Sequence, residues 1–250
     1  MRFDMTYVPA YATPGPLRLG LISLATDLTI EHDIQSLMPE GARLHVSRVA
    51  YANPTTPENL RAMAPHVAAS ADLILPGIPL AAIGYGCTSG AVVIGDAALA
   101  ASIGTVRPGV PVRTPPLAAV EGFRALGVRR LSLLTAYVPE TTSPMADYFR
   151  AAGFDLVRVE GLGLADDRDI AMVPAEDILA AARAADDPQA EAMFVACTAL
   201  PVLPLIDRIE AMLGKPVISS NQALGWAMLQ AAGLRGVGPG ALFKAKALAA

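Results

Sequence analysis

The chain has 250 residues, a formal net charge of −4, 53% hydrophobic residues and 17% charged residues. So apolar a composition excludes a disordered chain and is typical of a compact enzyme with well-covered strands. Lys and Arg form no cluster and aromatic residues make up only 5%, so nucleic acid is not an expected partner.

The mean hydropathy of +0.44 raises the question of a membrane protein. No apolar run reaches the roughly 18–20 uninterrupted residues that a spanning helix needs, so we expect no membrane association. Residues 1–16 lack a signal-peptide pattern, and we expect an irregular arm there and a cytoplasmic protein. The two cysteines, with no CxxC or HExxH motif, predict neither a metal site nor a disulfide.

Apolar runs alternate with helical patterns along the whole chain. In the first half we expect, in order, strand Leu17–Leu24, helix Thr29–Met38, strand Arg43–Tyr51, helix Thr56–Ala71, short strands Leu73–Leu75 and Ala81–Tyr85, a helix from about Ser89 to Ala101, strand Val110–Val112 and helix Leu117–Leu126. In the second half we expect strand Val128–Ala136, helix Ser143–Ala152, strand Asp155–Gly161, helix Ala175–Ala185, strand Ala192–Ala196, helix Leu203–Leu213, strand Val217–Ser219 and helix Ala223–Ala232. This alternation predicts an α/β fold with parallel sheets covered by helices on both faces. The acidic run at 165–169 is interpreted as a solvated loop.

Three pairs of segments recur in the same order in the two halves. LGLISL (19–24) resembles LSLLTA (131–136), GCTS (86–89) resembles ACTA (196–199), and GVPVRT (109–114) resembles GKPVIS (214–219). An internal duplication follows, and it predicts two pseudo-symmetric lobes with a cleft between them. We expect residues 1–116 plus 220–250 to form one lobe and residues 117–219 the other.

Cys87 and Cys197 occupy equivalent positions of this repeat, each just past an apolar strand and before a helix. Ligands of parallel α/β sheets bind at the carboxyl ends of the strands, where helix N–H groups attract a carboxylate and lower a thiol pKa. Thr88, Ser89 and Thr198 add hydroxyl groups there. Two thiols on opposite sides of one molecule can exchange a proton across a carbon, or one can attack it covalently. The alternative is that both are small buried apolar side chains.

Other strand ends offer polar side chains to the same cleft. Thr26 and Asp27 end the first strand, and Asp27 is expected to cap the next helix rather than to act in catalysis. Tyr137 ends the equivalent strand, where its phenol either binds a substrate oxygen or packs between the lobes. Four residues precede the last helix of a lobe, and we expect them either to bind a ligand or to cap that helix: Thr114, Ser219, Ser220 and Asn221. The three histidines, His32, His45 and His66, fall away from strand ends.

These segments resemble the aspartate/glutamate racemase superfamily, in the branch of maleate cis-trans isomerases, arylmalonate decarboxylases and racemase-like ectoine-utilisation proteins. LGLISLATDLTIE (19–31), YGCTSGAVVIG (85–95), LGVRRLSLLTAYVPE (126–140), FVACTAL (194–200) and KPVISSNQALGW (215–226) carry the resemblance. It implies two lobes with four-stranded parallel sheets, a buried site between them, no cofactor and a homo-oligomer. Cys87 and Cys197 match the paired catalytic cysteines, and Thr88, Ser89 and Tyr137 match residues that hold a carboxylate in the decarboxylases.

Departures from the family pattern reduce the number of reactions that we expect the protein to catalyse. Asp27 stands where maleate isomerases carry Asn, which argues against maleate, and Thr88-Ser89 replaces the Asn-Thr of amino-acid racemases. Arylmalonate decarboxylases carry Gly where this chain has Cys87, which argues against decarboxylation. Three hypotheses remain: an isomerase or racemase of a small carboxylate, a decarboxylase that uses Cys197 as proton donor, and a non-catalytic carboxylate-binding protein.

Overall fold

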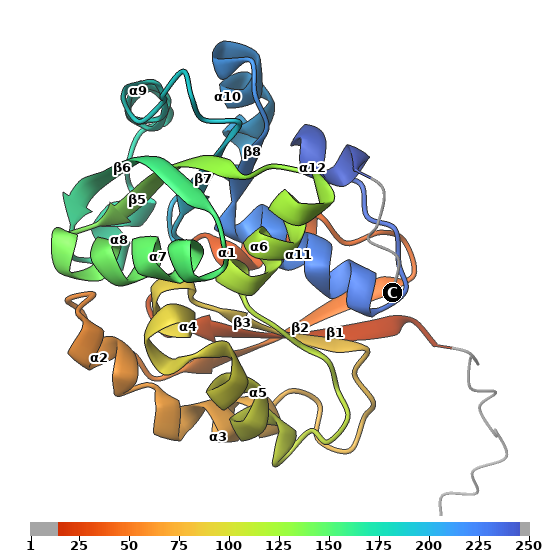
Figure 1. Cartoon of the computed structure of the whole chain (residues 1–250). Coiled ribbons are helices and arrows are strands. Elements are labelled where there is room, and N and C mark those ends of the chain that lie inside the picture. Colours follow the sequence, from red (N-terminus) through yellow and green to blue (C-terminus); the bar gives the residue numbers. More distant parts are fainter. Residues whose placement is uncertain (1–14, 246–250) are drawn as a thin grey trace, which may run out of the picture.

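The computed structural model describes residues 15–245, which form two four-stranded parallel sheets. The strand orders are β2-β1-β3-β4 and β6-β5-β7-β8, so the second sheet repeats the topology of the first. Figure 1 shows the first sheet in the lower half of the molecule and the second in the upper half, with helices between and outside them. The predicted α/β fold with two repeated parallel sheets is confirmed.

The first sheet is formed by the amino-terminal half of the described chain. Its elements are β1 (Leu17–Leu24), α1 (Ile30–Ser36), β2 (Ala42–Val49), α2 (Pro57–Arg61), the 3-10 turn η1 (Ala64–His66), α3 (Val67–Asp72), β3 (Ala82–Gly86), α4 (Thr88–Ile94), α5 (Asp96–Gly104) and β4 (Val112–Arg113). The second half contains α6 (Pro115–Ala125), β5 (Arg130–Tyr137), α7 (Pro139–Ala151), β6 (Asp155–Leu164), α8 (Asp167–Ala171), α9 (Ala175–Ala184), β7 (Ala192–Ala196), the 3-10 turn η2 (Leu203–Leu205), α10 (Ile206–Leu213), β8 (Val217–Ser219), α11 (Ser220–Ala231) and α12 (Gly240–Lys244).

Three predicted elements of the first half are wrong in detail. The predicted helix Thr56–Ala71 is divided into three short segments around Pro65, which has no N–H to continue the helical hydrogen bonds. The predicted strand Leu73–Leu75 is instead a turn, in which the Leu73 N–H donates to the Ala69 carbonyl. The expected helix from Ser89 to Ala101 is interrupted at Gly95, whose φ of 96° lies in the region that glycine alone adopts freely. The short helices α8 and α12 were not predicted.

Both central strands that lead to the cysteines are completely covered. Every residue of β3 and of β7 is buried, as expected for a parallel sheet with helices on both faces. The ring of Phe194, in β7, packs edge-to-face or tilted with those of Phe123 and Phe149, and the centroids of the three rings are 5.0–6.5 Å apart. This packing fixes the backbone of β7, and therefore fixes the point from which Cys197 emerges.

Helix α11 connects the two sheets. It directly follows β8 of the second sheet, yet Leu224 and Met228 pack in one apolar cluster with Leu19 and Leu21 of β1. Figure 1 shows α11 in the layer between the sheets. Ala223, Trp226 and Ala227 of the same helix pack in the apolar cluster of the second sheet. The division of the chain into two lobes stays a prediction. Residues 1–14, expected to be an irregular arm, lie outside the described residues. Within residues 15–245, no helix is long and apolar enough to cross a membrane.

We expect Leu224→Ala to lower the free energy of unfolding by about 2–5 kcal/mol, because it leaves a cavity between α11 and the first sheet. The midpoint of urea unfolding, followed by circular dichroism, measures this loss. Leu73→Ala is the matched control: Leu73 is 71% exposed, and the same truncation there should change stability by less than about 0.5 kcal/mol. Equal effects of the two substitutions would contradict the role of α11 as a packed connection.

Candidate active site

Cys87 lies at the carboxyl end of β3, at the position that caps α4. Its Sγ accepts a hydrogen bond from the Gly90 N–H at 3.2 Å and lies 3.8 Å from the Ser89 hydroxyl. A Cβ on residue 90 would lie 2.9 Å from this sulfur and 3.0 Å from the Tyr85 hydroxyl oxygen. Glycine is therefore required for the helix to approach the thiol so closely.

Cys197 takes the equivalent place at the end of β7, and a hydrogen-bonded chain connects its loop to that of Cys87. The Thr88 hydroxyl donates to Ser220 Oγ at 2.7 Å, and the Cys197 N–H donates to the same oxygen at 3.1 Å. The Thr198 hydroxyl donates to the Gly86 carbonyl at 3.4 Å. The two cysteine loops are thus held against each other by buried hydroxyl groups. Both cysteines are free thiols.

One small cavity, with a volume of about 10 Å³, lies between the two sheets and is lined by both cysteines. Each lobe contributes six lining residues, namely Leu24, Asp27, Tyr51, Thr55, Cys87 and Ser89 from the first and Tyr137, Asp167, Ile170, Cys197, Thr198 and Ala199 from the second. A cavity of this volume has room for about one water molecule. The side chains around the cysteines are therefore closely packed, and a ligand must move them apart to bind.

Eight residues are predicted from the sequence to be catalytic or to bind the substrate. Six of them line this cavity: Asp27, Cys87, Ser89, Tyr137, Cys197 and Thr198. The other two support it from behind. Thr88 donates to Ser220, as described above, and the Thr26 hydroxyl donates to Asp167. The histidines do not line the cavity. Of the residues expected to bind or cap, Thr114 donates to Asp96, and Ser219 caps α11 in a capping box with Gln222.

The interpretation of residues 165–169 as a solvated loop is wrong for Asp167. This residue begins α8, is 5% exposed and lines the cavity. Its Oδ1 accepts from Asn53 Nδ2 at 2.5 Å and its Oδ2 from the Thr26 hydroxyl. The signal that the sequence offered was its place after the carboxyl end of β6, where ligand sites of parallel sheets lie. Tyr51 and Thr55 also line the cavity and were not predicted, although they follow the carboxyl end of β2 in the same way.

Burial raises the pKa of both thiols to about 12, although each also accepts hydrogen bonds. For Cys87, the Gly90 N–H and the Ser89 hydroxyl offset part of this effect, and for Cys197 the Tyr137 side chain and the Ala199 N–H do so. The expectation that the helix N-terminus lowers the thiol pKa is therefore wrong: the thiolate loses more hydration than a few N–H groups restore. Both sulfurs are protonated at neutral pH when the cavity is empty.

Asp27 caps α1, as predicted. Its Oδ1 accepts hydrogen bonds from the N–H groups of Thr29 at 2.8 Å and Ile30 at 2.9 Å. Its side chain is 1% exposed, and burial raises its pKa above the ordinary value in spite of these hydrogen bonds. The second oxygen, Oδ2, is buried without a hydrogen-bond partner. Capping is thus only part of what this carboxyl group can do, because it also lines the cavity.

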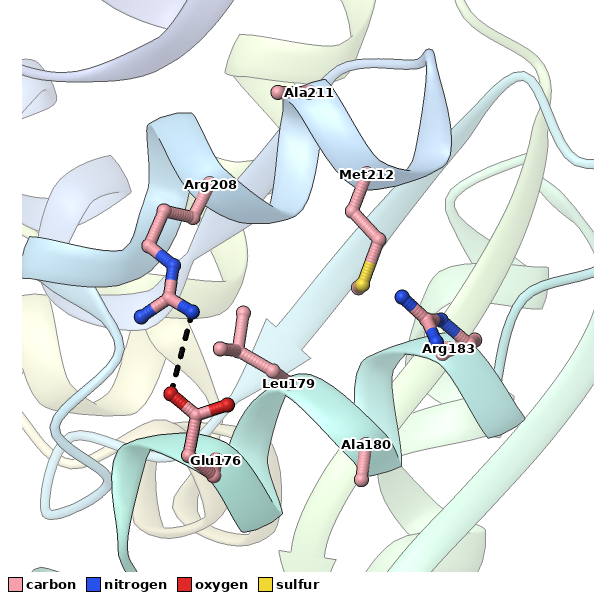
Figure 2. A pocket seen from close by; sticks show the side chains of 7 residues that line it. All are labelled: Glu176, Leu179, Ala180, Arg183, Arg208, Ala211 and Met212. Atoms are coloured by element: carbon pink, nitrogen blue, oxygen red, sulfur yellow. Dashed lines mark hydrogen bonds and ion pairs between the residues drawn. The ribbon is translucent and has the colours of Figure 1, made fainter.

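A second hollow lies on the outer face of the second lobe, between α9 and α10 (Figure 2). Leu179 and Met212 form its floor, and Glu176 and Arg208 form an ion pair across it at 3.2 Å. Both members of this pair are largely exposed, so the pair is worth little energy and is screened by salt. With no nucleophile among its lining residues, this hollow does not compete with the cysteine cavity as a candidate active site.

A family model described as arylmalonate decarboxylase matches residues 95–243, more than half of the chain. The chain belongs to the arylmalonate decarboxylase family. Within the Asp/Glu racemase-like superfamily it falls in the branch of maleate isomerases and arylmalonate decarboxylases, as predicted. It is 29% identical to a maleate isomerase of Nocardia farcinica over 239 residues, covering 91% of this chain and 94% of that protein. An arylmalonate decarboxylase of Bordetella bronchiseptica is 30% identical over about half of each chain.

Solved structures of this family resemble the chain over nearly its full length. A mutant of the Nocardia farcinica maleate cis-trans isomerase, with a covalently bound succinylcysteine intermediate, is 28% identical with a TM-score of 0.84, covering 92% of this chain and 98% of that one. A mutant arylmalonate decarboxylase in a liganded form is 25% identical with a TM-score of 0.79, covering 91% and 98%. None of these names mentions ectoine utilisation, so that subdivision stays a prediction, as do the cytoplasmic location and the homo-oligomer.

A buried carboxyl group of this family member supports the Cys197 loop. Asn221 Nδ2 donates both to Asp33 Oδ2 and to the Thr198 carbonyl, each at 2.8 Å. The Thr29 hydroxyl donates to the next carbonyl, that of Ala199, at 2.7 Å. Burial raises the pKa of Asp33 from 3.8 to about 6 despite the hydrogen bond from Asn221. The loop therefore depends on a side chain that changes its charge in mildly acidic solution.

Because the pKa of Asp33 is higher in the folded than in the unfolded chain, its contribution to stability is present below pH 3.8 and is lost as the pH rises through about 6. Asp33→Asn removes this dependence. We expect the stability of the variant relative to the parent to increase by about 2 kcal/mol between about pH 4 and pH 7, since one pKa unit corresponds to about 1.4 kcal/mol and part of the change falls below pH 4. Urea unfolding at a series of pH values measures the difference.

Asp72→Asn, at an exposed position of α3, is the control for the loss of one surface charge. If the two variants showed the same pH profile relative to the parent, the assignment of the effect to Asp33 would be wrong.

Proposed function

We propose that the protein is a cofactor-independent isomerase or racemase that acts on a small carboxylate through Cys87 and Cys197. The observation that carries the proposal is that two free thiols, from equivalent strand ends of the two lobes, line one cavity. Paired thiols are suited to covalent addition or to proton transfer at carbon.

Both routes start from one thiolate and one thiol, whereas burial keeps both sulfurs protonated. Both pKa values of about 12 mean that a proton must leave one sulfur before it can act. Racemisation would use the thiolate to remove a proton from one face of a carbon, while the opposite thiol donates its own proton to the other face. The sulfurs exchange roles in the next turnover, so no external proton donor is required.

Isomerisation would use the same groups differently. One thiolate adds to an alkene carbon, the C–S bond forms as the π bond breaks, and the electron pair moves into the adjoining carboxylate. Rotation about the resulting single bond and loss of the thiolate then give the other isomer. Hydroxyl groups at the cavity wall, those of Ser89 and Tyr137, are suited to stabilise the developing oxyanion. The succinylcysteine in the related Nocardia farcinica isomerase supports this route.

Decarboxylation is the second candidate, and a specific observation favours it. The match to the arylmalonate decarboxylase model begins at residue 95, so it contains Cys197 but not Cys87. A decarboxylase would need only one thiol, Cys197, to protonate the enediolate left by loss of CO₂. The presence of the second thiol in the same cavity is the reason to rank this activity below isomerisation or racemisation.

We expect Cys87→Ser and Cys197→Ser each to lower turnover by about 10²–10⁴-fold, because each substitution removes one of the two proton-transferring or nucleophilic groups. The measurement is deuterium incorporation from D₂O, or cis-trans conversion, followed by NMR across a panel of small mono- and dicarboxylates. Circular dichroism controls for folding.

The remaining outcomes separate the other functions. Survival of activity in Cys87→Gly, with its loss in Cys197→Ser and release of CO₂, would replace this proposal with the decarboxylase. Binding without turnover or exchange in the parent protein, unchanged in both serine variants, would indicate a non-catalytic carboxylate-binding protein.

A further inference from the structure

The charged side chains at the cavity wall are all acidic. Asp27 and Asp167 both line the cavity, whereas no Arg, Lys or His is among its lining residues in the described part of the chain. Asp27 is 1% exposed and Asp167 is 5% exposed, so water screens neither carboxyl group well. A bound dicarboxylate would therefore bring two further negative charges to a wall that offers no positive charge.

Asp27 has one carboxyl oxygen with no partner among the hydrogen bonds of the described chain. Its Oδ1 accepts from the N–H groups of Thr29 and Ile30 at the start of α1, and its Oδ2 is buried with no hydrogen-bond partner. The Thr198 hydroxyl, which donates to the Gly86 carbonyl, lies close enough to the Asp27 carboxyl group to lower its pKa. A buried acceptor without a partner is costly, and a ligand that supplies a donor there removes that cost. The Asp167 carboxyl group also raises the pKa of Asp27 by charge repulsion, a smaller effect than burial. A positive group on the ligand would relieve both effects.

Asp167 is held in place as an acceptor. Its two oxygens accept from Thr26 and from Asn53 Nδ2, and its own backbone N–H donates to Asn53 Oδ1 at 3.2 Å. Because both oxygens accept hydrogen bonds, the carboxyl group is held in one orientation. Asp167 and Asp27 therefore line the same cavity from two lobes, each as a hydrogen-bond acceptor.

The polar side chains next to the thiols are uncharged hydroxyl groups. The hydroxyl groups of Ser89 and Tyr137 line the cavity together with the two cysteines and supply hydrogen-bond donors without charge. A single carboxylate next to the reacting carbon can accept from them. The cavity wall thus combines neutral donors beside the cysteines with the two carboxyl groups of Asp27 and Asp167.

We propose that the substrate is a monocarboxylate whose other end carries a protonated amine, bound by Asp27 Oδ2 in the field of Asp167. The inference rests on the proposed function in that the carboxylate lies between Cys87 and Cys197. It goes further in replacing the second carboxylate, found in maleate, with a cationic nitrogen. Asp27 is then a specificity-determining residue as well as the cap of α1.

Four compounds that share a four-carbon chain test this proposal by isothermal titration calorimetry on the full-length protein: 4-aminobutyrate, succinamate, butyrate and succinate. They differ at one end only, which carries an ammonium, an amide, a methyl group or a second carboxylate. We expect 4-aminobutyrate to bind most tightly and succinate most weakly, with about a tenfold difference or more, as is typical of a hydrogen bond to a charged group.

Asp27→Asn keeps the Oδ1 that caps α1 and places an NH₂ donor where Oδ2 was. We expect it to weaken the binding of 4-aminobutyrate and to strengthen the binding of succinate, so that the order of their affinities is reversed. Asp167→Asn should shift the order in the same direction while leaving the α1 cap intact. Asp169→Asn, at an exposed position of the same helix, is the matched control and should leave the parent order unchanged.

Tighter binding of succinate than of 4-aminobutyrate by the parent protein would overturn the proposal, and would mean that Asp27 is a protonated donor to a second carboxylate. Failure of 4-aminobutyrate to bind up to its solubility limit, or an unchanged order in Asp27→Asn, would overturn it as well. The test reads binding and not turnover. Failure of the isomerase or racemase proposal would appear instead as deuterium exchange that persists in both cysteine variants.

Discussion

The hydroxyl group of Ser220 is the contact on which the geometry of the candidate site depends. It accepts from Thr88, the residue after one cysteine, and from the backbone N–H of Cys197, the other cysteine. Ser220 itself begins α11, which packs against the first sheet although it follows the last strand of the second. One buried oxygen therefore connects both thiol loops and the helix that joins the lobes. Deep burial makes this network rigid, because each of its polar groups would be costly to leave without a partner.

The burial that makes this network rigid also determines the pKa of the two thiols. A helix N-terminus near Cys87 and a phenol near Cys197 favour thiolates, but loss of hydration outweighs them and both pKa values rise to about 12. A site of this kind is inert to solvent in its empty state. A ligand carboxylate beside the thiols opposes thiolate formation further, whereas a positive group on the ligand favours it.

The sequence predicted the architecture because its signals are local and repeated. Alternation of apolar runs and helical patterns gave both parallel sheets, and β7 was predicted at its observed bounds. Repetition around Cys87 and Cys197 identified four lining residues of the cavity, and the ends of the first strand of each half identified two more, Asp27 and Tyr137. The predictions failed where a single residue, Pro65 or Gly95, interrupts a helix. They also failed where contacts between residues distant in the sequence determine whether a side chain is buried. Asp167 looked like part of a solvated acidic run, because nothing near it in the sequence reveals that Asn53 and Thr26 enclose it.

That missed aspartate changes what the site can be expected to bind. With Asp27 alone, a single acidic side chain that caps a helix could be regarded as structural, since both of the backbone donors it satisfies belong to α1. Asp167 lines the same cavity, and no basic side chain of residues 15–245 is among the lining residues, so the carboxyl pair favours a ligand with a positive group. Two enzymes with the same fold and the same pair of thiols can therefore differ in substrate charge. Under the two proposals made for this protein, the thiols define the reaction, and the carboxyl groups on the same wall define which small carboxylate reaches them.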